Sequence, residues 1–230
     1  MKKLILIAVF AVFSASTAIS ASLTPSIGIS YNNAGYAGEG TERNFDESGV
    51  HRTTTQEYGA FAEQYGSIFV ELGIGDIFAV GIDYVPADIS SPKNASREGS
   101  TLEKMDPGSS TVQAEFTDLT TAYLKVNIPV LGGTYLKAGF AQVDVVINES
   151  MVSGNTYKDV NTEGYMAGLG YNHELANGLS IRAEATVNQF DDVQSDNGVT
   201  TASESNGGQN KVQVESMWGA RGTISLVKSF

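Results

Sequence analysis

Apolar residues in this chain alternate with polar ones, and after residue 21 no stretch is apolar for the ~20 residues that a transmembrane helix needs. The alternation is clear in residues 68–74, 78–84, 122–128, 136–140, 165–171 and 179–187, and it recurs at 27–31 and 218–230. A period of two is typical of strands that bury one face. The sequence therefore predicts an all-β fold. If the chain lies in a membrane, it must cross it as a closed barrel, because an open sheet would leave unpaired backbone groups in lipid.

The connections between these segments differ in length in a regular order. Short turn signals stand at 75–76, 129–133 and 175–178, and long polar stretches stand at 34–57, 86–111, 148–162 and 191–210. An eight-stranded meander with both ends in the periplasm needs three short turns and four long loops. We therefore predict an eight-stranded antiparallel up-and-down transmembrane β-barrel, formed as one domain by residues 22–230.

The first 21 residues have the order of a secretory signal peptide. Lys2 and Lys3 form a basic start, residues 4–13 are an unbroken apolar run, and residues 14–21 are mostly small. A helix over that run would rise only about 15 Å, half of a bilayer core, so a cleaved signal is favoured over a membrane anchor. We expect export into the periplasm, with cleavage after Ala18, Ser20 or Ala21.

Acidic residues outnumber basic ones, 26 to 14, which gives a formal net charge of −12. Such a charge repels nucleic-acid phosphates, so nucleic-acid binding is not expected. The chain has no cysteine and therefore no disulfide or thiolate site. The long polar stretches are acidic, and we expect weak divalent-cation binding there among neighbouring lipopolysaccharide phosphates, without a built metal site.

The polar face of the predicted strands carries charges of both signs. The charged residues are Glu71, Asp83, Lys125, Lys137, Arg182, Glu184 and Arg221. In a membrane barrel they face the lumen, whereas in a soluble lipocalin-like barrel they face water, and the strands alone do not distinguish the two. Glycines are frequent on the same face, which fits a cramped concave side and favours the membrane barrel.

Eight strands leave room inside for side chains but not for a water-filled channel. An unpaired ion there would cost several kcal/mol, so the charges are expected to pair with one another. We interpret the seven residues as a lumen charge network that holds strand register and closes the barrel. The alternative is a selectivity or gating network for ions, which requires the pairs to rearrange.

Three segments carry a family resemblance. Residues 134–141 (TYLKAGFA), 164–171 (GYMAGLGY) and 178–185 (GLSIRAEA), with a terminal Phe230, resemble the small outer-membrane β-barrel proteins of the outer membrane protein A type and their porin-like relatives. The likeness covers most of the chain after residue 21. It implies a monomer in the outer membrane of a Gram-negative bacterium, surrounded by outer-membrane lipid and lipopolysaccharide.

The resemblance also implies a partner during insertion. In this family the barrel assembly machinery reads the last strand and its terminal aromatic residue, and Trp218, Ile224, Leu226 and Phe230 occupy matching places. Lys228 departs from the aromatic or apolar residue usual there, although a lysine can snorkel to the headgroups.

Aromatic residues near the ends of the apolar faces are candidates for the interfacial girdles. The set is Tyr31, Phe78, Tyr84, Phe140, Tyr165, Tyr171, Trp218 and Phe230. Packing in a soluble β core is the alternative for these side chains.

Some outer-membrane barrels are enzymes, and one loop brings suitable residue types together. His51 lies near Asp46, Glu47 and Ser48, as a base would lie beside an orienting carboxylate and a nucleophile. Such residues are abundant in polar loops, and a charged lumen does not suit a lipid chain, so we do not expect catalysis. We interpret His173 as an interfacial polar residue.

One acidic cluster invites a calcium hypothesis. Asp191, Asp192 and Asp196 supply the carboxylates that hard cations prefer, but their spacing matches no calcium loop, and a solvated acidic loop is favoured. No cofactor or metal site is predicted.

Taken together, these features favour a structural or surface-interaction role for a barrel with a closed, ion-paired lumen and acidic extracellular loops, whose surface ligand the sequence does not identify. A narrow porin-like channel for ions or small solutes is the alternative. A lipid- or peptide-modifying barrel enzyme is a third hypothesis.

Overall fold

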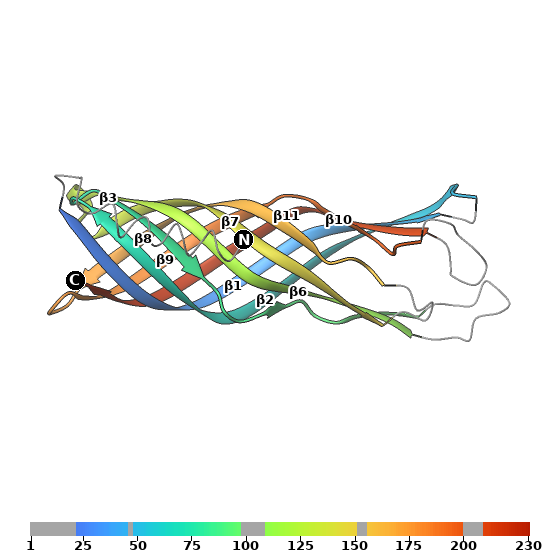
Figure 1. Ribbon diagram of the computed structural model, residues 1–230, viewed down its shortest axis with the longest axis horizontal. Coiled ribbons are helices and arrows are strands. Elements are labelled where there is room, and N and C mark those ends of the chain that lie inside the picture. The colour runs from blue at the N-terminus through green and yellow to red at the C-terminus, as the bar shows by residue number, and fades with distance from the viewer. Residues whose placement is uncertain (1–21, 46–47, 98–108, 151–155, 200–208) are drawn as a thin grey trace.

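The computed structural model describes residues 22–45, 48–97, 109–150, 156–199 and 209–230. Almost all of them lie in long strands (Figure 1). The elements are β1 (Leu23–Phe45), β2 (His51–Ile74), β3 (Phe78–Tyr84), β4 (Ile89–Ser90), β5 (Asn94–Arg97), β6 (Ser109–Asn127), the 3-10 turn η2 (Pro129–Leu131), β7 (Thr134–Ser150), β8 (Val160–Glu174), β9 (Leu179–Phe190), β10 (Val193–Asp196) and β11 (Gln209–Ser229).

Eight of these strands close into a ring. Hydrogen bonding runs through β1, β2, β3, β6, β7, β8, β9 and β11, and β11 pairs back with β1, always antiparallel. The closing seam is long, since it runs from Ser26 opposite Ser229 to Phe45 opposite Gln209. The predicted eight-stranded antiparallel barrel is confirmed.

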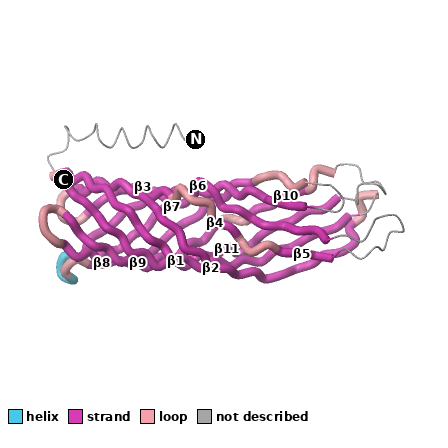
Figure 2. Tube along the Cα trace, turned by 90° about the horizontal axis from the view of Figure 1, so that it is seen from below, coloured by secondary structure: helices cyan, strands magenta, loops and turns pink. Residues whose placement is uncertain are grey.

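Three short turns lie at the end of the barrel that holds the C-terminus (Figures 1 and 2). At the first, Gly75 takes a φ of +61°, and at the last, Asn177 and Gly178 take φ values of +58° and +72°. Asn and Gly tolerate this left-handed backbone best, which is why these turns could be recognised in the sequence. The middle turn is η2, which Pro129 begins.

The strands continue far into the stretches that were expected to be loops. Residues 34–57 were expected to be one polar loop, but β1 reaches Phe45, β2 begins at His51, and the two pair along this length. That expectation is wrong because backbone pairing does not depend on an apolar face; beyond the membrane the outward side meets water and the alternation fades. Figure 1 accordingly shows strands that extend far from the end of the barrel that holds the short turns.

The two faces of the wall near the turns have opposite character. The outward apolar side chains are exposed, with Leu136 at 53% and Ile181 at 44%, whereas inward-facing Arg182 and Glu184 are only 4% and 9% exposed. A soluble barrel would have the reverse arrangement, so the lipocalin-like alternative is wrong. No helix among the described residues is long and apolar enough to cross a membrane.

The wall changes character where β3 ends. β2 pairs with β3 only as far as Ile68 opposite Tyr84, and beyond that point its described pairing is with β1 alone. The chain after β3 turns inward, so that Val85 and Ile89 are almost completely buried. Next, β4 and β5 pair with β6 along the same edge that β3 occupies nearer the turns.

Candidate functional site

All seven residues proposed for the lumen charge network lie on the inner face, each no more than 9% exposed. They come from β2, β3, β6, β7, β9 and β11, and alternation along each strand directs them inward. Barrel closure brings together residues that are more than 100 positions apart in sequence, such as Glu71 and Arg182.

Glu71 is the centre of the network. Its carboxylate accepts two hydrogen bonds from the Arg182 guanidinium, both at 2.9 Å, and one from Lys125 Nζ at 2.6 Å. The Tyr123 hydroxyl donates a fourth at 3.1 Å. A bidentate arginine with further donors is the geometry in which a buried carboxylate is best compensated.

A second pair lies beside this cluster. Lys137 Nζ donates to Glu184 Oε1 at 3.0 Å, and it also lies 4.0 Å from the centre of the Tyr123 ring. Tyr123 therefore contacts both ionic groups, with its hydroxyl on Glu71 and its ring face on Lys137. The attraction of a cation to an aromatic face adds to such a contact when water is excluded.

The third pair, Asp83 and Arg221, is looser. Arg221 lies 3.7 Å from Asp83 Oδ1, too far for a hydrogen bond, while the Ser67 hydroxyl donates to Asp83 Oδ2 at 3.0 Å. Ser67 in turn accepts a bond from Asn32, which accepts one from Thr223. This chain of polar groups crosses the closing seam between β1 and β11.

Glycines on the inner face stand opposite aromatic rings. Gly28 faces Phe69, Gly81 faces Tyr123, Gly170 faces Tyr135 and Gly219 faces Tyr36, each as a direct cross-strand pair. A Cβ at the first three positions would overlap the opposing ring. The absence of a side chain thus lets each ring lie against the neighbouring strand. Glycines were expected on this face from the sequence, whereas the aromatic rings opposite them were not.

An apolar layer closes the lumen beyond the charged one. It consists of Ala34, Tyr65, Val85, Ile89, Leu119, Ala141 and Val143, with Tyr36, Phe61, Phe116 and Phe190 packed against it. Several of these residues lie in stretches that were expected to be loops. The inward turn after β3 supplies Val85 and Ile89, which follow no strand period, and a register shift in β6 separates Phe116 from Leu119.

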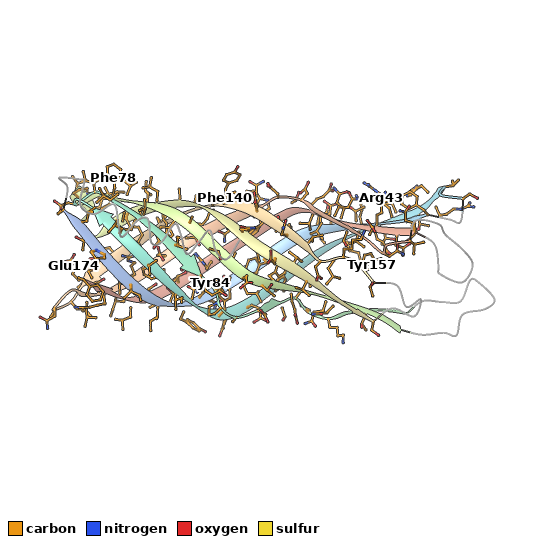
Figure 3. The ribbon with its side chains drawn as sticks, viewed as in Figure 1. Arg43, Phe78, Tyr84, Phe140, Tyr157 and Glu174 are labelled. Carbon is orange, nitrogen blue, oxygen red and sulfur yellow. The ribbon has the colours of Figure 1, made fainter. Side chains whose placement is uncertain are left out.

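The girdle candidates lie on the outer surface at two levels. Figure 3 shows Phe78 near the turn end, and Phe140 and Tyr84 nearer the middle of the barrel. Tyr84 is half-buried, and its hydroxyl donates to Asp118 at 2.7 Å. Tyr171 and Trp218 are 48% and 49% exposed. The strands project well beyond the second level, toward Arg43 and Tyr157.

The residues of the proposed assembly signal lie on β11 and just after it. Ile224, Leu226 and Trp218 are exposed on the outward face, and Phe230 is 74% exposed at the chain end. Lys228, which departs from the family pattern, donates from Nζ to the Asn177 carbonyl in the neighbouring turn.

The loop residues weighed for catalysis or metal binding are not assembled into a site in the part of the chain that the structure describes. His51 bonds Thr54 at 2.8 Å, whereas Asp46 and Glu47 lie outside the described residues. The Asp196 carboxylate forms an ion pair with Lys158 at 3.3 Å and accepts a hydrogen bond from the Gly198 backbone N–H at 2.9 Å. Among the described residues, no group of three acidic, histidine or cysteine side chains could hold a metal ion.

Comparison with known proteins decides the family. The model of the outer membrane protein beta-barrel domain matches residues 5–214. The chain belongs to this family. It is therefore a small outer-membrane β-barrel protein of the Gram-negative envelope, and its exposed apolar band faces lipid. No curated protein sequence matches the chain.

Solved structures support the same fold. The outer membrane protein OprG from Pseudomonas aeruginosa is 12% identical, with a TM-score of 0.53, and the match covers 89% of this chain and 95% of OprG. The outer membrane protease OmpT from Escherichia coli is 11% identical, with a TM-score of 0.50, and the match covers 89% of this chain and 97% of OmpT. At such identities the likeness extends to the fold alone, because one fold hosts many functions.

Proposed function

We propose that this outer-membrane barrel has a structural and surface-contact role and that its lumen is closed to ions. The observation that carries the proposal is the filled interior. Arg182 and Lys125 both donate hydrogen bonds to Glu71 across the lumen, and an apolar layer lies beyond them. Conduction would require buried ion pairs to separate in a restricted space, which costs several kcal/mol.

Recordings in planar bilayers test the closed lumen. The wild-type protein should show no steady unitary conductance. A variant that opens both layers, with Glu71, Lys125 and Arg182 changed to alanine together with Tyr65, Leu119 and Val143, should conduct, because the side chains that fill the lumen are removed. Its matched control changes Lys158 and Asp196, an exposed pair with side chains 70% and 40% accessible, and should remain silent. Steady wild-type conductance would favour the narrow channel instead.

The surface-contact role rests on the walls that project beyond the lipid band. Gly40 lies directly opposite Glu57 on the β1–β2 hairpin, so residues 41–56 can be replaced by an Asn-Gly turn without changing the register. Cells that lack the protein should lose both resistance to detergent and cell–cell adhesion. The shortened variant should restore the first property only. Restoration of adhesion by the shortened variant would contradict a role for the hairpin.

We also propose that the barrel assembly machinery recognises the end of β11. Exposure of Phe230 beside the outward Leu226 and Ile224 supports this. Deletion of Phe230 should lower the amount of heat-modifiable barrel in the outer membrane, while Phe230→Trp should retain it. Equal assembly of both variants would exclude the terminal aromatic as a signal.

A further inference from the structure

The part of the barrel that extends beyond the level of Tyr84, away from the three short turns, is called the projecting half. A cavity of about 400 Å³ lies in it, bordered by Tyr36, Phe61, Phe116 and Phe190. Small-molecule sites have volumes of about 300–1,000 Å³ and are mostly apolar with a few polar groups. An apolar cavity of about 150 Å³ is enough to bind benzene, so this one has room for a bicyclic ring. The cavity is separate from the lumen charge network, because the residues of that network do not line it.

Phe116 is nearly parallel to two other lining rings, Tyr36 and Phe61, which are tilted 31° to each other. The Phe116 ring lies 14° from the plane of Tyr36 and 19° from that of Phe61, with ring centres 6.4 and 6.0 Å apart. The Tyr36 hydroxyl is fixed by a 2.8 Å hydrogen bond to Tyr65. Aromatic rings held in this way offer faces on which a flat aromatic molecule can stack.

The cavity has a closed floor and an open side. Leu119 and Ile89, which belong to the buried apolar layer, form part of its lining. Residues 57–61 line it consecutively, from both faces of β2, and it is along this stretch that the described pairing of β2 is with β1 alone. Ser91 and Pro92 border it after β4. A small molecule can therefore reach the rings past the edge of β2.

The charge around the cavity selects among aromatic ligands. Glu57 contributes to the lining, and no lysine, arginine or histidine among the described residues does so. The whole chain carries a formal charge of −12. An anionic ligand would meet repulsion without a compensating base, whereas a neutral or cationic one would not.

We propose that this cavity is a binding site for a small planar aromatic solute that carries no negative charge. The site does not depend on the structural role proposed above, since a closed lumen and a ligand site in the projecting half are compatible. Its chemistry is ring stacking on Phe61, Phe116 and Tyr36, with exclusion of anions by the acidic border.

Ligand-observed fluorine NMR tests the proposal with full-length mature protein in lipid nanodiscs, because the alkyl chains of detergent would compete for the cavity. The probes are 5-fluoroindole, 5-fluorotryptamine and 5-fluoroindole-3-acetate, which are neutral, cationic and anionic. The first two should bind, and the acetate should bind about tenfold more weakly or not at all. Equal binding of all three, or the same signal from empty nanodiscs, would overturn the proposal.

Two substitutions locate the binding. Phe61→Ala should weaken binding of 5-fluoroindole about threefold to tenfold, which corresponds to the loss of one stacked ring. Ala114→Phe should abolish binding by filling the cavity. The matched control Phe140→Ala removes an outward ring that pairs with Tyr165 and should leave binding unchanged. Heat-modifiable gel mobility verifies that each variant is folded. Unchanged binding by folded Phe61→Ala and Ala114→Phe proteins would refute the site.

Discussion

Substitution of Glu71 by glutamine tests whether the buried cations Lys125 and Arg182 depend on this carboxylate for compensation. The carboxylate accepts four hydrogen bonds, from Lys125, Arg182 and Tyr123. Glutamine keeps the shape but offers one acceptor oxygen and no charge, and its NH₂ group faces donors. Two buried cations then lose their counterion. Removing one partner of such a pair costs about 3–5 kcal/mol, so the free energy of unfolding of Glu71→Gln should fall by about that amount.

The matched control is Asp196→Asn, which breaks the exposed pair with Lys158. Exposed pairs contribute about 0–1 kcal/mol. Both free energies of unfolding can be measured by urea titration in lipid vesicles, with the fluorescence of the single tryptophan, Trp218, as the signal. If the two variants differ by less than about 1 kcal/mol, Lys125 and Arg182 do not depend on the charge of Glu71 for compensation.

A triple change separates the loss of charge from the loss of volume. Methionine at positions 71, 125 and 182 removes all three ions but fills much of the same space. Replacing a complete buried ion network by apolar residues is often neutral or stabilising by about 1–4 kcal/mol. The triple variant should therefore be at least as stable as Glu71→Gln in the same titration, and a lower stability would show that packing, not charge pairing, governs this layer.

Further predictions concern the inner wall and the outer surface. Gly81→Ala places a methyl group against the Tyr123 ring and should lower the free energy of unfolding by about 1–3 kcal/mol, whereas Gly35→Ala, whose nearest heavy atom would be 3.9 Å away, should be nearly neutral in the same titration. The Gly198 backbone N–H and Lys158 hold the pKa of Asp196 below its ordinary value. The Asp196–Lys158 link should therefore persist as the pH falls through the usual aspartate range and break only below it. Carboxyl NMR titration should show this, and Lys158→Gln should raise the pKa; an Asp196 pKa at or above the ordinary value would contradict this assignment.

The strands and their inward and outward faces could be predicted from the sequence for the part of the barrel near the turns, which we call the membrane half. Much less could be predicted for the projecting half. In the membrane half, lipid outside and a tight lumen inside impose strict alternation, so the apolar positions of β9 and the charges of Arg182 and Glu184 could be assigned from spacing alone. The partners within the lumen could not be assigned, because pairing of Glu71 with Arg182 depends on barrel closure. Phe69 and Tyr135 were missed because the inner face was interpreted by its charges, although the glycine opposite each ring was a usable signal.

In the projecting half the apolar side chains face the interior, whereas near the turns they face outward. This reversal accounts for the weak alternation of apolar and polar residues along the whole strands. Near the turns apolar side chains face outward, as Leu124 does on β6, but Phe116, an even number of positions away along the same strand, packs against the apolar interior. The register shifts between them, where Asp118 adopts a φ of +54°. A bulge of this kind transfers alternate side chains to the other face.

The same change occurs on β11. Trp218 is 49% exposed on the outward side, whereas Val214, beyond Ser216 with its φ of +52°, lies together with Met217 against Gly38 of β1. The register of β1 against β11 shifts at this level, between Ala37 and Glu39. A wall that leaves lipid for water must bury its apolar residues inside instead of outside, and the two bulges perform this exchange. Both bulges lie close to aromatic residues of the outer surface, since Tyr84 pairs with Thr120 beside the first and Trp218 stands two positions from Ser216 at the second.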